Sequence, residues 1–509
     1  MFNDQFANFI ERAINLAAAL FVVAVGLALI GLVGLYIYDK TQRQHAVLRN
    51  FPVLGHLRYV FEDMGQFFRQ YFFSADREEM PFNRAQRSWA YQASKGVDNT
   101  VAFGSTRLLT PVGTVMFVNC PFPTLQADAS ETQPLVVGPE CPHPYTTSSL
   151  FNISAMSFGA ISVPAVRALS KGAKKAGCWM NTGEGGLSSY HLEGGCDIVF
   201  QIGTAKYGVR DADGQLSLDK LRSIAAHEQV KMFEIKLSQG AKPGKGGILP
   251  GAKVTAEIAT TRGIPEGQDS ISPNRHPEVN SIAELLDMVD IVRRTTGKPT
   301  GFKAVIGGYD WIDELCHEIL QRGADSAPDF ITIDSADGGT GAAPAPLMDY
   351  VGLPISETLP LVVNILNRHG LKKRIRVITS GKLINPAEMA WALCMGADFV
   401  VSARGFMFAL GCIQALQCNK NTCPTGITTH DEHLQQGLDP TIKAERVANY
   451  VSNMTYEVGM IAHSCGVPEP RQLGRMHARI VGNDGRTIGL DDLYPEEIAI
   501  LDNRSTPSL

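Results

Sequence analysis

From about residue 150 onward, short apolar runs alternate with stretches of helical periodicity. Alternating strands and helices are typical of parallel βα units, and eight such units predict a closed (β/α)8 TIM barrel. An open doubly wound sheet is the alternative, but no predicted strand is followed by G-x-G-x-x-G with an acidic residue beyond it. Helical patterns such as Ala165–Ala176, Trp311–Arg322 and Pro386–Met395 lie between strands. The predicted strands are Phe151–Ala155, Cys178–Asn181, Ile198–Ile202, Met232–Leu237, Gly301–Ile306, Phe330–Asp334, Arg376–Thr379 and Phe399–Ser402.

Near the N-terminus the apolar pattern is continuous. Residues from Ala13 to Tyr38 carry no charge, and the run is longer than a helix needs to cross the hydrocarbon core of a bilayer. We therefore predict a transmembrane anchor in residues 1–40. A cleaved signal peptide is the competing interpretation, and the length of the run and the acidic residues before it argue against that. Basic residues after the span predict a single pass through the cytoplasmic membrane with the large C-terminal part in the cytoplasm; they are Lys40, Arg43 and Arg49.

Three further segments complete the predicted organisation. Residues 41–145 read as an irregular segment rich in aromatic and basic residues. Such a mixture can bind lipid headgroups or nucleic acid, but its charge is too mixed for an electrostatic footprint. We therefore interpret it as a collar that packs on the barrel. The barrel and its loops occupy residues 146–470, and residues 471–509 form a C-terminal tail.

Composition narrows the class of function. The chain has 509 residues, a formal net charge of −5 and no basic run, so nucleic acid is not an expected partner. Seven of the ten cysteines are scattered without a framework pattern. That distribution indicates reduced thiols in a cytoplasmic protein rather than a disulfide scaffold.

The other cysteines, Cys412, Cys418 and Cys423, share the short segment GCIQALQCNKNTCPTG. Closely spaced thiolates ligate iron–sulfur clusters, and a proline after the final ligand is common in ferredoxin-type loops. Three ligands indicate a three-iron cluster, or a four-iron cluster with one ligand of another kind. Three buried free thiols or a zinc site are the alternatives.

Polar residues and glycines follow the predicted strands, where the function of a barrel lies. Taken singly, they are equally typical of helix caps and turns. Lys236 and Lys303 differ, because each lies in an apolar strand where an unpaired ammonium is costly. We expect a bound anion or an electron-rich ring beside them. The residues at the strand ends are Met156, Ser157, Gly159, Gly183, Glu184, Gly185, Gln201, Gln239, Lys242, Asp337, Gly338, Gly339, Thr340, Gly341, Ser380, Gly381, Ala403, Arg404 and Gly405.

The glycines after the seventh and eighth strands match the place where barrels hold a phosphate with backbone N–H groups. A lysine near a ring, a phosphate site and an adjacent iron–sulfur loop together predict a flavin mononucleotide (FMN) enzyme. No dinucleotide-binding fold for NAD is visible in the sequence.

The chain resembles the FMN-binding synthase domain of glutamate synthase, and most closely the membrane-anchored, stand-alone versions of that domain. In the family, a 3Fe-4S cluster relays electrons to FMN. Reduced FMN then delivers a hydride to 2-iminoglutarate, made from 2-oxoglutarate and ammonia, giving L-glutamate. The matching stretches are ISAMSFGAIS (153–162), NTGEGG (181–186), QGAKPGKGGILPGAKV (239–254), ISPNRHPEVNSIAEL (271–285), DGGTGA (337–342) and GCIQALQCNKNTCPTG (411–426).

The resemblance implies roles for individual residues. The keto-acid contacts correspond to Glu184, Lys236, Gln239, Lys242 and Arg262, and the first three are the catalytic candidates. This set suits a dianionic keto acid, because arginine clamps a carboxylate and lysine supplies a point charge. The implied cluster ligands are Cys412, Cys418 and Cys423. The implied FMN contacts are Met156, Ser157, Gln201, Lys303, Asp337, Gly338, Gly339, Thr340, Gly341, Ser380, Gly381, Ala403 and Arg404.

The chain also departs from the family. The glutaminase domain and the C-terminal β-helical domain have no counterpart, so we expect no release of ammonia from glutamine, and no NADPH site is visible. Ala343 follows DGGTGA where the family has serine. The turn Ser380-Gly381-Lys382 replaces Asp-Gly-Gln, and Ala403-Arg404 replaces Gly-Thr. Both changes touch the implied phosphate and ring edge of the flavin.

Three functions remain as alternatives. The first is a glutamate-synthase-like oxidoreductase that takes electrons from a donor such as ferredoxin or a reductase subunit. The second is a related flavin enzyme for another 2-oxo or 2-imino acid. The third is an electron-transfer module at the membrane. The retained carboxylate clamp favours the first two, because a pure relay needs no such site.

Overall fold

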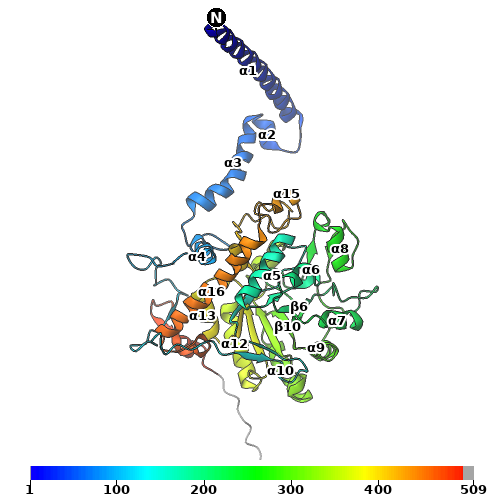
Figure 1. Ribbon diagram of the computed structural model, residues 1–509, viewed down its shortest axis with the longest axis vertical. Helices are drawn as coiled ribbons and strands as arrows, with labels where there is room; N and C mark the ends of the chain where they lie inside the picture. The colour runs from blue at the N-terminus through cyan, green and yellow to red at the C-terminus, as the bar shows by residue number, and fades with distance from the viewer. Residues whose placement is uncertain (1, 497–509) are drawn as a thin grey trace, which may run out of the picture. The chain divides into compact units, whose positions relative to one another are not determined.

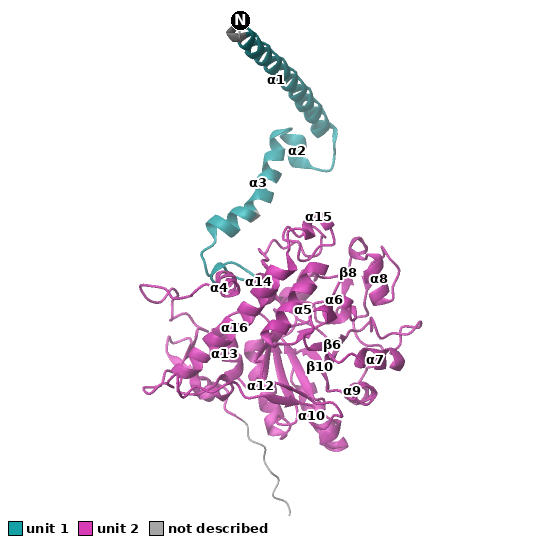
Figure 2. Ribbon diagram, in the orientation of Figure 1, with its two compact units in different colours: residues 1–85 teal, residues 86–509 magenta. Residues whose placement is uncertain are grey.

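The computed structural model describes residues 2–496, and the chain divides into two compact units (Figure 2). Unit 1 comprises residues 1–85 and unit 2 comprises residues 86–509. The division falls inside the predicted collar. The other domain boundaries drawn from the sequence stay predictions.

Unit 2 is built around a closed barrel of parallel strands, which confirms the predicted fold (Figure 1). Each predicted strand has an observed counterpart within the described residues. These are β4 (Phe151–Ile153), β5 (Met180–Asn181), β6 (Ile198–Ile202), β7 (Val230–Lys236), β10 (Thr300–Val305), β11 (Phe330–Asp334), β12 (Arg376–Ser380) and β13 (Phe399–Ser402). Hydrogen-bonded neighbours follow the order β10-β11-β12-β13-β4-β5-β6-β7, and β7 pairs with β10 to close the barrel.

The barrel strands are mostly apolar because both of their faces are covered, and their few polar residues lie mainly toward the ends. All residues of β6 and β11 are buried. A hairpin of β2 (Leu135–Val137) and β3 (Tyr145–Thr147) adds Val137 and Tyr145 to the core cluster that holds Trp179, Met232 and Phe399. These core residues lie at or near the strand beginnings, so the hairpin closes the N-terminal end of the barrel and leaves the other end for a site.

Helices surround the barrel, and the cap residues explain where they begin and end. Ser162 caps α5, with its Oγ accepting from the N–H of Ala165, and Gly177 ends it with a φ of 68°. The helices are α5 (Val163–Ala176), α6 (Ser189–Glu193), α7 (Leu218–Ala225), α8 (Ala256–Arg262), α9 (Ile282–Thr296), α10 (Asp310–Arg322), α11 (Ala345–Tyr350), α12 (Ile355–Arg368), α13 (Pro386–Cys394), α14 (Arg404–Leu410), α15 (Glu432–Gln435), α16 (Pro440–Ser464) and α17 (Leu490–Leu493).

Besides the β2–β3 hairpin, two further small sheets lie outside the barrel within the described residues. One pairs β8 (Ile248–Leu249) with β9 (Ser270–Ile271). The other joins β1 (Val115–Phe117), β14 (Ala478–Val481) and β15 (Thr487–Gly489) in antiparallel order. It connects the predicted collar to the predicted tail, which the sequence presents as separate segments. Residues 497–509 of that tail lie outside the described residues.

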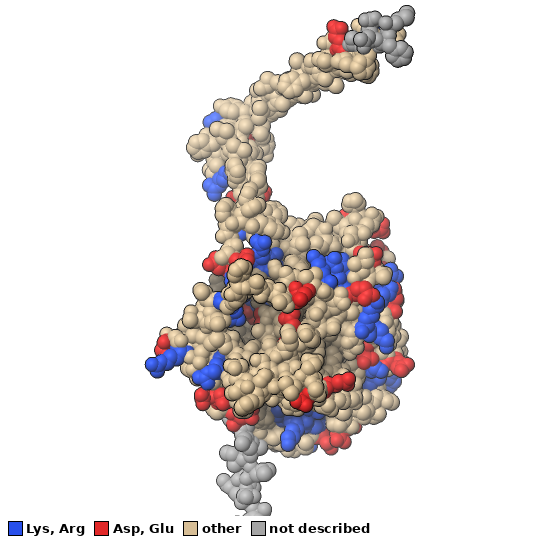
Figure 3. All heavy atoms as spheres, turned by 60° about the vertical axis from the view of Figure 1, so that its left-hand side comes forward, with Lys and Arg blue, Asp and Glu red and all other residues tan. Residues whose placement is uncertain are grey.

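Unit 1 begins with α1 (Phe2–Thr41), of which Asn8–Thr41 is long and apolar enough to cross a membrane. In Figure 3 most of α1 is uncharged, and blue basic groups appear beside the helices that follow it. Those helices are α2 (Ala46–Asn50) and α3 (Leu54–Phe68), which continues as a π-helical turn, Arg69–Phe73.

The predicted collar is therefore not irregular throughout. It also contains the helix α4 (Arg84–Lys95). The indole N–H of Trp89 on α4 donates to Glu457 on α16 at 2.9 Å. The expectation of irregular structure is wrong for α3 and α4, where apolar residues of α3 recur in steps of three and four among many aromatic residues.

Candidate functional site

A cavity opens at the C-terminal end of the barrel, and every barrel strand or the loop after it contributes to the lining. Its volume is about 1320 Å³, including the part open to solvent. Of the predicted site residues, Asp337, Gly338, Cys412 and Cys423 do not line it. Those that do are Met156, Ser157, Glu184, Gln201, Lys236, Gln239, Lys242, Arg262, Lys303, Gly339, Thr340, Gly341, Ser380, Gly381, Ala403, Arg404 and Cys418. Their roles stay predictions, but the fold brings them into one space.

Positive charge gathers on one side of the cavity around a single carboxylate. The ammonium of Lys236, at the end of β7, lies 3.0 Å from Oε1 of Glu184 and 2.5 Å from Oε1 of Gln239. Burial raises the pKa of Glu184, but Lys236, Lys242 and Arg262 outweigh it and leave that pKa below its ordinary value. The carboxylate is therefore ionised at neutral pH.

The charge of Lys242 is only partly balanced by the carboxylate of Glu184. Burial lowers its pKa, the neighbouring Lys236 lowers it further, and Glu184 offsets only part, so the pKa of Lys242 falls to about 8. Near neutral pH this lysine is charged, yet it lies close to its titration point. An anionic ligand beside it would stabilise the charged form.

Arg262, the last residue of α8, lies against the strand-one loop. Its guanidinium donates to Ser270 Oγ at 3.2 Å and to the main-chain oxygen of Phe158 at 3.3 Å, and stacks over Tyr207 with its Cζ 5.2 Å from the ring centroid. Its Nε is buried and has no hydrogen-bond partner among the described residues. A buried donor without a partner is costly, so this face of Arg262 is suited to receive an anion.

The second strand lysine, Lys303, is paired inside the protein. Its ammonium lies 3.1 Å from Asp334 Oδ2, the last residue of β11. Burial lowers the pKa of Lys303, but Asp334 and Glu234 raise it more. Both strand lysines have carboxylate partners on neighbouring elements, so the cost of an unpaired ammonium does not by itself require a ligand. The expected anion or ring beside them stays a prediction. Such ion pairs could not be predicted from the sequence, because knowing which strands are neighbours does not show which of their side chains meet.

Two turns at the ends of β11 and β12 meet at a close approach. Gly381 has a φ of 120°, and a Cβ added there would lie 2.2 Å from the Cβ of Ser335. Asp337 lies outside the cavity, but its carboxylate binds the Lys382 ammonium at 3.0 Å, and Lys382 lines the cavity. By contrast, nothing lies within 4 Å of a Cβ built on Gly341.

The cysteine loop lies beside this cavity and joins it through Cys418. Burial raises the pKa of Cys412, and the charges of Cys418 and Cys423 raise it further. Arg404 Nη1 lies 3.8 Å from Cys418 Sγ. Hydrogen bonds from Thr425 and Thr428 outweigh burial and lower the pKa of Cys423. Nearby donors and a cation favour thiolates, the form that binds metal.

The loop backbone is also strained. Gln414, Leu416 and Asn421 all have φ between 55° and 61°, a left-handed conformation that is unfavourable for residues other than glycine. Strain of this kind persists where surrounding structure holds it and is concentrated at functional sites. Asn421 is held in place through its side-chain oxygen, which accepts from the N–H of His430 at 2.8 Å.

Lys253 is a site residue that the sequence analysis missed. Its buried ammonium donates to the main-chain oxygens of Ala160 at 3.0 Å, Cys418 at 3.3 Å and Thr428 at 2.8 Å. It therefore ties the strand-one loop to the cysteine loop. A signal was present, since Lys253 lies within the matching stretch 239–254, but its partners are main-chain atoms and leave no trace in the sequence.

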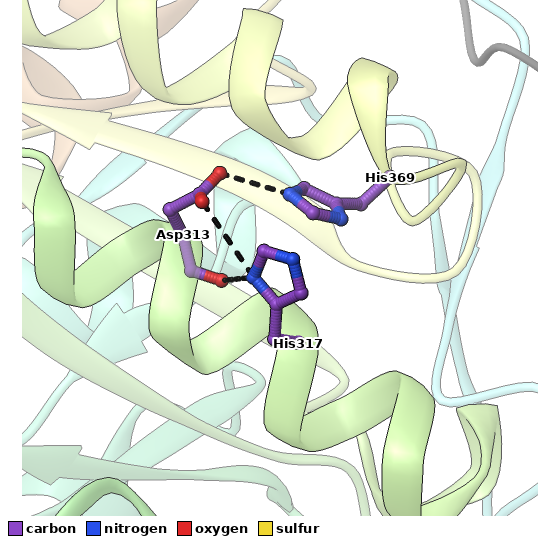
Figure 4. A group of neighbouring side chains, drawn as sticks. All are labelled: Asp313, His317 and His369. Carbon is purple, nitrogen blue, oxygen red and sulfur yellow. Dashed lines mark hydrogen bonds and ion pairs between the residues drawn. The ribbon is translucent and has the colours of Figure 1, made fainter.

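Outside the cavity, Asp313, His317 and His369 place their polar atoms within 4.8 Å of one another (Figure 4). A hydrogen bond from His369 lowers the pKa of Asp313, and Arg368 lies 3.4 Å from the same carboxylate. The Nδ1 atom of His317 lies 2.9 Å from the main-chain oxygen of Asp313, so that nitrogen carries the proton and is not a free ligand. The group is an ion-pair cluster on the helices α10 and α12.

A conserved region in glutamate synthase matches residues 111–468. The chain belongs to the glutamate synthase family. It is 38% identical to the glutamate synthase large subunit-like protein YerD of Bacillus subtilis (strain 168), over 96% of this chain and 100% of that protein. It is 34% identical to the archaeal-type glutamate synthase [NADPH] of Dehalococcoides mccartyi (strain ATCC BAA-2266 / KCTC 15142 / 195), over 69% of this chain and 65% of that protein.

Among solved structures, mandelate oxidase superposes on this glutamate synthase family member with a TM-score of 0.45 and 14% identity, over 78% of this chain and 90% of that one. The barrel assignment rests on the strand pairing, and this similarity carries no argument of its own.

Proposed function

We propose that this chain is an FMN-dependent, glutamate-synthase-like oxidoreductase that reduces 2-iminoglutarate to L-glutamate. The observation that carries the proposal is the convergence of Lys236, Lys242 and Arg262 around Glu184 in the barrel cavity. A 2-oxo dicarboxylate and its imine bring two negative charges, which these cations can receive. Membership of the glutamate synthase family supports the same substrate class.

The cations have distinct parts in this proposal. Arg262 presents its unpartnered Nε to one carboxylate, while Lys242 supplies a point charge to the other. Lys236 stays hydrogen-bonded to Gln239 and so holds that amide at the cavity wall. Lys236 on β7 and Arg262 on α8 are held by packed elements, so these two contacts form with little reorganisation.

Reduction of the imine adds a hydride to C2 and a proton to the nitrogen, and converts the C=N double bond into a C–N single bond. Glu184 is the candidate for handling that proton, since it is buried in the cavity wall and surrounded by donors. Because its low pKa keeps Glu184 ionised, the carboxylate orients the imine nitrogen, and the proton comes from the ammonium of Lys236, which Glu184 holds at 3.0 Å and which is reprotonated from solvent.

The cavity fits FMN by the chemistry of its lining. Backbone of Gly339, Gly341 and Gly381 faces the same space as the cations Lys382 and Arg404, a combination suited to a phosphate. Open space beside Gly341 leaves room for a ligand to approach the main chain. When bound, FMN supplies the hydride, and a cluster held by Cys412, Cys418 and Cys423 supplies electrons. We propose 3Fe-4S for that cluster because three cysteines share one short loop.

The remaining parts of the proposal concern location and partners. Helix α1 anchors the chain in the cytoplasmic membrane by a single pass, and the basic residues after it keep the catalytic unit in the cytoplasm. Electrons come from a donor such as ferredoxin or a reductase subunit. Ammonia enters from solution or from a partner.

The test is a spectroscopic titration of the full chain purified in detergent. Addition of 2-oxoglutarate should perturb the flavin absorbance of the wild type. Arg262→Ala should weaken that binding by about 2–5 kcal/mol, the range for removing one partner of a buried charge contact. FMN and iron content, measured on the same samples, should be unchanged.

Arg222→Ala is the matched control, because Arg222 is exposed on α7 and pairs with Asp219 outside the cavity. Equal affinity in wild type and Arg262→Ala would remove the assigned substrate site. A wild type that ignores 2-oxoglutarate but responds to another 2-oxo acid would redirect the proposal to that acid. Absence of any response would favour the electron-transfer module.

A further inference from the structure

We propose that α3 and the π-helical turn after it lie in the membrane interface, as a second membrane contact beside α1. This surface, residues 54–73, makes an amphipathic helical element. The inference rests on the proposed membrane anchorage and is independent of the proposed chemistry.

One face of α3 is apolar at helical spacing. Steps of three and four residues place side chains on one side of a helix. The stripe is formed by Leu54, Leu57, Phe61, Met64 and Phe68, and all five side chains are exposed. The stripe continues into the π-helical turn, where Phe72 and Phe73 are 75% and 76% exposed. Within the described part of unit 1, nothing covers this face.

The opposite side of α3 is polar. Helical geometry places Tyr59 and Asp63 about half a turn away from Phe61, and Arg58 lies at the edge of the stripe. A surface helix of a soluble protein normally buries its apolar face. Large exposed apolar patches of this kind indicate a binding surface for membrane or protein.

A buried contact fixes the start of α3 to the end of the candidate membrane helix. Asp39 is fully buried although it lies in the last turns of α1. Its carboxylate accepts the N–H of Val53 at 2.8 Å and contacts His56 Nε2 at 3.0 Å. The carboxylate thereby connects α1 directly to α3. The C-terminal end of the apolar helix therefore lies next to the start of the apolar stripe.

The composition of residues 54–73 favours the membrane–water interface over the hydrocarbon core. Charged residues on the polar side of α3, such as Glu62 and Asp63, exclude a second span. Aromatic side chains prefer the headgroup boundary, and Phe and Tyr are frequent from Phe61 to Phe73. Basic residues Arg43, Arg49 and Arg58 would meet anionic headgroups. These features are those of helices that lie flat in a membrane surface.

Quenching by brominated lipid tests the proposal on the full chain in liposomes of phosphatidylethanolamine and phosphatidylglycerol. Phe61→Trp places a reporter on the stripe, and Tyr59→Trp places one on the polar side. The four native tryptophans contribute the same background to both variants. Circular dichroism and urea unfolding check that each variant is folded.

We expect lipids brominated near the headgroup end of the acyl chains to quench Trp at 61 at least about twofold more than Trp at 59, as a flat interfacial helix requires. Phe68→Trp, one step further along the stripe, should behave like Phe61→Trp. Equal quenching at positions 59 and 61, or stronger quenching by bromine at the chain ends, would overturn the interfacial placement.

Flotation of the liposomes separates this result from a failure of anchorage. If the protein floats with the lipid but Trp at 61 is not quenched, α1 is an anchor and the stripe is covered by unit 2 or a second copy, which overturns the proposal. A protein that does not float would overturn both the anchorage and the interfacial helix while leaving the keto-acid titration untouched.

Discussion

The ammonium of Lys236 lies 3.0 Å from the carboxylate of Glu184, and both side chains line the barrel cavity. This ion pair joins β7 to the loop after β5. Its carboxylate also lies near Lys242 and Arg262, which help to lower its pKa. A single acid thus balances a group of cations, and the charge left over suits a dianionic ligand.

Replacing that acid should separate binding from turnover. In Glu184→Gln the cations lose their internal counter-charge, so 2-oxoglutarate should bind at least as tightly as in the wild type. Imine reduction should slow by about 10²–10⁴-fold, the range for loss of a positioned proton-transfer group. Single-turnover reoxidation of the reduced flavin measures the rate. Glu278→Gln, which removes the partner of Lys206 instead, is the control, and an unchanged rate in Glu184→Gln would remove Glu184 from the proton path.

Substrate affinity should depend on pH through Lys242. Its pKa is lowered to about 8, so the cation is present below that pH and is lost as pH rises through it. The dissociation constant of 2-oxoglutarate should therefore rise above pH 8, approaching about tenfold per pH unit for one lost proton. The flavin titration repeated from neutral to alkaline pH checks this. Lys242→Arg should extend tight binding to higher pH, and a wild-type affinity that is flat across the range would contradict the role.

The cysteine loop makes a prediction about metal. Cys412→Ser, Cys418→Ser and Cys423→Ser should each lose the brown absorbance and most of the iron, because the cluster needs every thiolate. Cys394 and Cys465 are buried elsewhere in unit 2, and burial raises the pKa of both thiols. Serine at either position should leave iron content unchanged. Full iron in all three loop variants, measured by a colorimetric assay, would dismiss the cluster.

A pair of glycines distinguishes folding from ligand binding. Gly381→Ala forces a Cβ against Ser335 and strains a left-handed backbone, which costs about 1–3 kcal/mol from the backbone alone. Both stability and FMN content should fall. Gly341→Ala meets no protein atom, so stability should be kept while FMN affinity weakens. Urea unfolding and a flavin assay give the two readouts; normal FMN affinity in Gly341→Ala would show that the open space there is not used by the cofactor.

The local chain pattern predicts the barrel well. Strands such as Ile198–Ile202 and Phe330–Asp334 are found with the same bounds as predicted. A strand covered on both faces is mostly apolar, so its pattern is a property of its own residues. The glycines and polar residues at strand ends could also be predicted from the sequence, because the topology of a barrel puts all C-terminal strand ends at one opening.

Contacts between segments that are distant in the sequence could not be predicted from it. The pairing of Lys303 with Asp334, the three carbonyls bound by Lys253, and the pairing of β1 with β14 join residues far apart in the chain. None changes the periodicity of its own segment, and main-chain partners carry no residue identity at all.

The sequence by itself therefore determined the barrel, the cysteine loop, the family resemblance and the apolar helix at the N-terminus, because each is written in residues adjacent along the chain. Only the tertiary structure decided how the buried charges are balanced, which loops Lys253 holds together, and that Asp39 fixes α3 beside the end of α1. The physical reason is that compensation of a buried charge depends on distance in space, and folding brings together groups that no local pattern relates.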